Sequence, residues 1–82
     1  MQAKTLAQKL DHFQADSIWL DQHYNDFKEQ YPEQWIAVYG KAIIDHGRSL
    51  ATLMKRLRRK YGKRTGDIVV RFVSTEEVIL VV

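Results

Sequence analysis

The apolar positions at the start of the chain recur at alternating steps of four and three residues, the spacing of one helical face. The series comprises positions 6, 10, 13, 17, 20, 24, 27 and 31, all apolar except for a serine at 17. We expect two helices, over residues 3–14 and about 17–30, because Asp16 or Ser17 is placed to cap the second one. Pro32 ends the series, since the residue before a proline is disfavoured in the α region.

Two short apolar runs follow and flank the pair Gly40-Lys41. Residues 35–39 and 42–46 have the length and composition of strands, which predicts a β-hairpin with a two-residue loop. Glycine in the first loop position favours a type II′ turn, since that position takes a positive φ.

A third helix is expected over about 50–61, with Ser49 as its N-cap and Gly62 just after its end. Its apolar stripe consists of Leu50, Leu53, Met54, Leu57 and Tyr61. Residues 67–73 are predicted as a further strand, and residues 78–82 as a last strand or an extended tail. The expected fold class is α+β, with a single small sheet of four strands, a β-hairpin plus a β-α-β unit, and two to three helices packed on one face. The crossover of that unit should be right-handed if its strands pair in parallel.

The length predicts one domain over residues 1–82, with an amphipathic N-terminal arm at 1–15, a core at 17–73 and an apolar C-terminal strand at 77–82. Hydrophobic residues at 45% and charged residues at 28% are ordinary for a globular protein and argue against disorder. The chain has no cysteine, which excludes thiol catalysis, thiolate zinc sites and disulfides. We expect a cytoplasmic protein without membrane contact, because no run resembles a signal peptide or a membrane span.

The net charge of +3 conceals a segregation of charge along the chain. Residues 48–64 carry eight Lys and Arg and no acid, whereas residues 1–47 and 65–82 are each net acidic. The cations predicted to form a contact surface are Lys55, Arg56, Arg58, Arg59, Lys60, Lys63 and Arg64. Like charges at helical spacing cost stability, so either an anionic partner or the acidic N-terminal helix packed alongside is expected to compensate them.

The residues around the hairpin form a further series: Trp19, Tyr31-Pro32, Trp35-Ile36-Ala37-Val38, Gly40, Ile43-Ile44 and Gly47. On this series, residues 17–73 resemble a small prokaryotic domain-of-unknown-function family. The resemblance implies a small α+β module with no established activity and no catalytic residues to transfer. The association of some members with genes for retropepsin-type aspartic proteases implies a paired or adaptor role. The arm at 1–15, the tail at 78–82 and the basic density of 55–64 depart from the family pattern.

No group of residues has the spacing of a catalytic or metal site. His12, His23 and His46 are too far apart in the predicted elements to share a metal, and the acids fall singly on helix surfaces. The segment 62–66 has glycines and cations but lacks the Walker spacing. We therefore expect no enzyme, no metal and no cofactor.

The N-terminal arm and the C-terminal strand each present apolar residues with no evident internal partner. The predicted self-association residues are Leu6, Leu10, Phe13, Val78, Leu80 and Val82, and the expected homo-oligomer is a dimer. The leading hypothesis is a non-enzymatic protein-interaction or adaptor module that docks an unidentified protein partner through its basic helix. The alternative is a nucleic-acid-binding protein that contacts phosphates with the basic helix 50–64.

Overall fold

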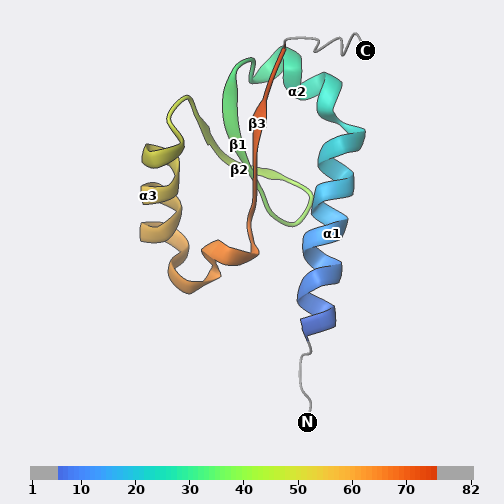
Figure 1. Ribbon diagram of the computed structural model, residues 1–82, viewed down its shortest axis with the longest axis vertical. Helices are drawn as coiled ribbons and strands as arrows, with labels where there is room; N and C mark the ends of the chain where they lie inside the picture. The colour runs from blue at the N-terminus through green and yellow to red at the C-terminus, as the bar shows by residue number, and fades with distance from the viewer. Residues whose placement is uncertain (1–5, 76–82) are drawn as a thin grey trace, which may run out of the picture.

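The computed structural model describes residues 6–75, with side chains from residue 12 onward (Figure 1). Its elements are α1 (Leu6–Gln22), α2 (Tyr24–Gln30), β1 (Gln34–Val38), β2 (Ile43–Gly47), α3 (Leu50–Tyr61), the 3-10 helix η1 (Gly62–Asp67) and β3 (Val69–Val73). The chain is therefore α+β, as the sequence predicts, and both strands of the hairpin lie within one residue of their expected positions.

The sheet has the strand order β2-β1-β3, and both pairs are antiparallel. Because β2 and β3 both run antiparallel to β1, they are parallel to each other but are separated by the central strand. The expected β-α-β unit therefore crosses over β1 instead of joining two paired strands. Three strands make up the sheet within residues 6–75, and the fourth strand predicted at 77–82 lies outside the described residues.

Helices cover both faces of the sheet, so the prediction that they pack on one face is wrong (Figure 1). Alternate residues of a strand point to opposite faces. Ile36 and Val38 pack with Leu20 of α1 and with α2, whereas Ala37 packs with Leu57 of α3. The central strand β1 is buried on both sides, which is why its residues 35–38 read as a continuous apolar run rather than an alternating one.

The first helix continues to Gln22 and breaks at His23, six to seven residues beyond the cap expected at Asp16 or Ser17. Asp16 instead lies inside α1 with only 1% of its surface exposed. Its carboxylate accepts hydrogen bonds from the backbone N–H groups of Gly40 (3.1 Å) and Lys41 (2.9 Å) at the tip of the hairpin. The side chain that the sequence assigns to a helix start therefore attaches the hairpin to α1.

The hairpin tip has the geometry of a type I′ turn, not the expected type II′ turn. Gly40 and Lys41 both have positive φ, at 61° and 58°, and Tyr39 donates its N–H to the carbonyl of Ala42 (3.0 Å). This conformation directs the two turn amides toward one acceptor, the Asp16 carboxylate.

Candidate anion-binding surface

Local sequence signals position α3 as predicted. The hydroxyl of Ser49 accepts a hydrogen bond from the Thr52 N–H, and Gly62, with φ at 56°, ends the helix. Leu53 and Leu57 are fully buried against the sheet. Because this stripe faces the protein, the remaining positions of the helix project their side chains into solvent.

All seven predicted contact cations are exposed on α3 and η1. Six of them form no ion pair with any carboxylate in the described part of the chain, and we call these six the basic face. The basic face consists of Lys55, Arg58, Arg59, Lys60, Lys63 and Arg64. The structure thus brings most of the predicted contact residues together on one element and its continuation.

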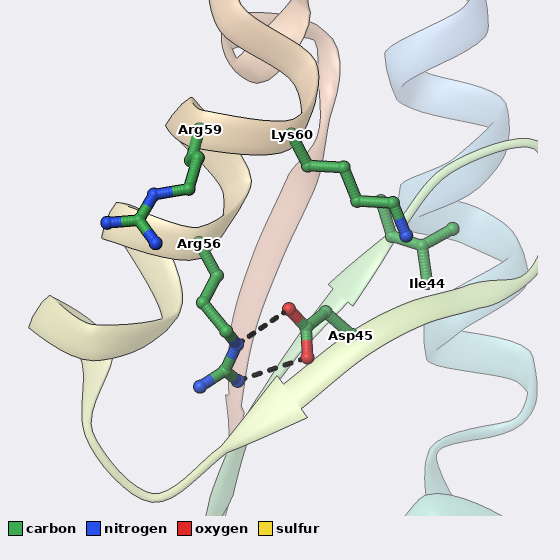
Figure 2. Close-up of a pocket in the computed structure, with 5 residues that line it drawn as sticks. All are labelled: Ile44, Asp45, Arg56, Arg59 and Lys60. Carbon is green, nitrogen blue, oxygen red and sulfur yellow. Dashed lines mark hydrogen bonds and ion pairs between the residues drawn. The ribbon is translucent and has the colours of Figure 1, made fainter.

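Arg56 is the exception, because its guanidinium is bound to Asp45 of β2 (Figure 2). Its Nε and Nη2 atoms donate to Asp45 Oδ2 and Oδ1, each at 3.1 Å, and Nη2 also donates to the carbonyl of His46 at 2.8 Å. The guanidinium holds the pKa of Asp45 below its ordinary value, and the carboxylate raises the pKa of Arg56. Arg56 therefore makes three hydrogen bonds within the domain, and its role as a contact residue stays a prediction.

The pair of Asp45 and Arg56 covers an edge of the sheet. β2 is an edge strand, and such strands present backbone groups that invite pairing with another chain. At His46 the N–H donates to Asp45 Oδ1 (2.8 Å) while the carbonyl accepts from Arg56. Both backbone groups of His46 are therefore bound to side chains. Nothing in the sequence distinguishes Arg56 from its basic neighbours, since its partner is eleven residues away on another element.

The acidic N-terminal helix does not neutralise the basic face. α1 packs on the opposite side of the sheet from α3 (Figure 1). Among the described side chains of α1, Asp21 pairs with Arg71 of β3, with Oδ1 and Nη1 3.0 Å apart. The sequence allowed two ways to compensate the repulsion among these cations, an anionic partner or the acidic helix packed alongside. The packing of α1 excludes the second.

An open groove of about 450 Å³ lies between α3 and β2, lined by Ile44, Asp45, Arg56, Arg59 and Lys60 (Figure 2). A β-bulge accounts for its floor: Ala37 is opposite Asp45 and Val38 is opposite Ile43, which leaves Ile44 unpaired. Ile44 packs in the α3-side cluster, so it and Asp45 both face α3. Figure 2 shows Lys60 extending over Ile44 while Arg59 points away from the strand.

The described histidines have local partners. His12 Nε2 lies 3.8 Å from Asp16, and His46 Nδ1 lies 2.9 Å from the amide oxygen of Gln34. No cluster of three His, Asp or Glu side chains suited to a metal occurs within the described part of the chain. In that part, too, no helix is long and apolar enough to span a bilayer.

The predicted self-association residues are described only in part. Phe13 on α1 is 39% exposed, and Ile18, which the sequence reasoning did not select, is 56% exposed. Leu6 and Leu10 lie on α1, with side chains outside the described set. The C-terminal candidates Val78, Leu80 and Val82 lie outside the described residues.

The ion pair at the sheet edge predicts a pH-dependent stability. Because the pKa of Asp45 is lowered by folding, its contribution to stability is present above the ordinary carboxyl pKa and is lost as the pH falls through the lowered value. We expect Asp45→Asn to destabilise the protein at pH 7, with the difference from wild type shrinking toward pH 3 in urea unfolding experiments. Hydrogen bonds from Thr75 also lower the pKa of Glu33, so Glu33 adds to the loss of stability at low pH. A Glu33→Gln variant measured in parallel distinguishes its contribution from that of Asp45. A wild-type advantage that is constant from pH 7 to pH 3 would contradict the assignment.

Fold and surface together define a small three-layer module, with a sheet between α1–α2 and a basic α3. Residues 26–76 match the Family of unknown function (DUF5678), and the chain belongs to this family. The match confirms that the chain is a member of a domain-of-unknown-function family, and it spans α3 and the sheet but begins within α2. No curated protein and no solved structure matches the chain.

Proposed function

We propose that this protein is a non-enzymatic interaction module that docks an acidic segment of a partner protein on the basic face of α3 and η1. One observation carries the proposal: six exposed cations stand on one helix and its continuation without an ion pair to any described carboxylate. A cytoplasmic location fits a chain without cysteine.

The energetic cost of the basic face supports a binding role. Within α3, Lys55 lies three residues from Arg58 and four from Arg59, and each such like-charge pair on a helix costs roughly 0.2–0.5 kcal/mol. Cations in the last turn of α3 interact favourably with the helix dipole, but this benefit is confined to that turn. An anionic partner would relieve the repulsion over the whole face.

The groove beside the basic face favours a protein partner. Its floor is the apolar Ile44, and its walls include Arg59 and Lys60. A protein segment offers carboxylates and apolar side chains together, whereas phosphates use only the cations. Nucleic acid is the second candidate, since three of the six cations are arginines, whose planar guanidinium groups bind phosphate oxygens bidentately.

The test is a titration of two fluorescently labelled probes, a Glu-rich peptide and a single-stranded oligonucleotide, at low and near-physiological salt. We expect the peptide to bind at micromolar concentration at low salt and more weakly at near-physiological salt, because screening weakens its charged contacts. Tighter binding of the oligonucleotide with a steep salt dependence would favour the second candidate. Failure of both probes to bind at low salt would contradict the proposal.

We also propose that α1 mediates self-association into a dimer. Figure 1 shows the N-terminal part of α1 extending past the sheet, and Phe13 and Ile18 are exposed on this helix. We expect sedimentation velocity to show a dimer at micromolar concentration. A single monomeric species would remove this part of the proposal.

A further inference from the structure

A second, smaller recess lies at the C-terminal end of α3, apart from the open groove. It has a volume of about 80 Å³ and is lined by Tyr39, Tyr61, Arg64 and Ile68. Ile68 is 6% exposed, and Tyr61 packs beside it in the α3-side cluster. Tyr39, which follows β1, is 40% exposed and contributes a wall that faces solvent.

The recess combines an apolar lining with one cation. Three of its four residues present apolar or aromatic surface, and the fourth, Arg64, belongs to the basic face and has no ion pair with a described carboxylate. Lys60, which lines the groove, has its Nζ 5.6 Å from the ring centroid of Tyr61, which lines the recess. A ligand bound along the basic face would therefore meet an apolar depression beside its charged contacts.

We propose that this recess receives an apolar side chain of the acidic segment that binds the basic face. The inference rests on the proposed function and adds the chemistry of the partner: an aliphatic or aromatic anchor flanked by carboxylates. Interfaces draw most of their binding energy from a few side chains inserted into desolvated pockets, while surrounding charges mainly set association and orientation. The basic face supplies the charge complementarity, and the recess supplies the pocket.

The geometry favours a side chain over a nucleobase. A base stacks on an open aromatic face. The Tyr39 ring already contacts the His12 ring in an edge arrangement, with centroids 4.7 Å apart and planes at 77°. The Tyr61 ring has the Nζ of Lys60 5.6 Å from its centroid. Because each tyrosine ring already contacts a neighbouring side chain, neither offers the free face on which a base would stack.

The experiment compares two labelled peptides of glutamate and serine that differ only in a central residue, leucine in one and alanine in the other. We expect the leucine peptide to bind roughly tenfold more tightly, as expected when an anchor side chain is truncated. This ratio should persist as salt rises, because screening weakens the charged contacts and leaves apolar burial in place. Tyr39→Ser should reduce the ratio toward one, whereas Leu50→Ser, which removes an exposed apolar side chain at the opposite end of α3 from the recess, should not change it.

The outcomes separate the inference from the function on which it rests. Equal affinity of the two peptides would overturn the recess as an anchor site and leave the basic face as the binding surface. A ratio that Tyr39→Ser leaves unchanged would also overturn it, provided that circular dichroism shows the variant folded. If neither peptide binds at low salt, the proposed function itself fails.

Discussion

Replacing Asp16 with alanine is expected to lower the free energy of unfolding by about 2–4 kcal/mol, because two hydrogen bonds to a charged group are lost. The carboxylate is 99% buried and joins α1 to the Gly40 and Lys41 amides, which have no other hydrogen-bond acceptor described. Since both turn residues have positive φ, the turn loses the contact that holds this conformation against α1. A decrease in Tm of roughly 10–25 °C corresponds to this loss in a domain of such size.

The matched control for this prediction is Asp21→Asn on the same helix. The Asp21 side chain is 65% exposed, so its replacement is expected to change the free energy of unfolding by no more than about 0.5 kcal/mol. Asp16→Asn keeps the shape of the side chain but places an N–H donor against the turn amides. We therefore expect its loss in free energy of unfolding to lie between those of Asp16→Ala and Asp21→Asn. Urea unfolding of the three variants measures all of these effects. Equal stability of Asp16→Ala and Asp21→Asn would show that the buried carboxylate does not hold the hairpin.

Reversing charge at Arg58 and Arg59 together is expected to weaken binding of the Glu-rich peptide by about tenfold to a hundredfold at low salt. Both guanidinium groups are exposed and unpaired in the described structure, so their replacement by glutamate turns attraction into repulsion without breaking a contact of the fold. Arg56 must be left in place, because its loss would uncover the edge of β2 and confuse binding with aggregation. The measurement is the peptide titration by fluorescence anisotropy at two salt concentrations.

A control with the same change in net charge separates the basic face from the overall charge of the protein. Lys28→Glu together with Lys41→Glu changes the net charge by the same amount as the double reversal at Arg58 and Arg59. Lys28 lies on α2, across the sheet from α3, and Lys41 lies at the hairpin tip, which is bound to α1. We expect this variant to bind the peptide within about threefold of wild type at near-physiological salt, where distant charges are screened. Equal weakening by the two double variants would attribute binding to net charge alone and contradict a localised surface.

The most predictable element was α3, because every signal that defines it is local. Its cap at Ser49, its end at Gly62 and its stripe of Leu53 and Leu57 all lie within the helix or next to it. The exposure of its cations followed from the same periodicity. The exception is Arg56, whose partner lies on another strand, so no local pattern separated it from Arg58 or Arg59.

The errors lie where long-range contacts decide. Asp16 is a good capping residue by type, and only the approach of the hairpin shows that its carboxylate serves the turn amides from within a continuous helix. The turn type depended likewise on Lys41 taking positive φ, which a lysine adopts rarely without such support. The break between α1 and α2 occurs at His23, and it was not predicted because no Gly or Pro at this position signals the end of a helix.

The sequence by itself determined the helices, the hairpin and the concentration of positive charge, because periodicity, caps and composition act over a few residues. Only the tertiary structure decided that α3 lies across the sheet from the acidic α1, since burial of β1 on both faces requires a helix layer on each side. That separation leaves six cations of the basic face unpaired among the described residues. It also assigns Arg56 to the edge of β2, where its guanidinium satisfies backbone and carboxylate acceptors that lie on a different element.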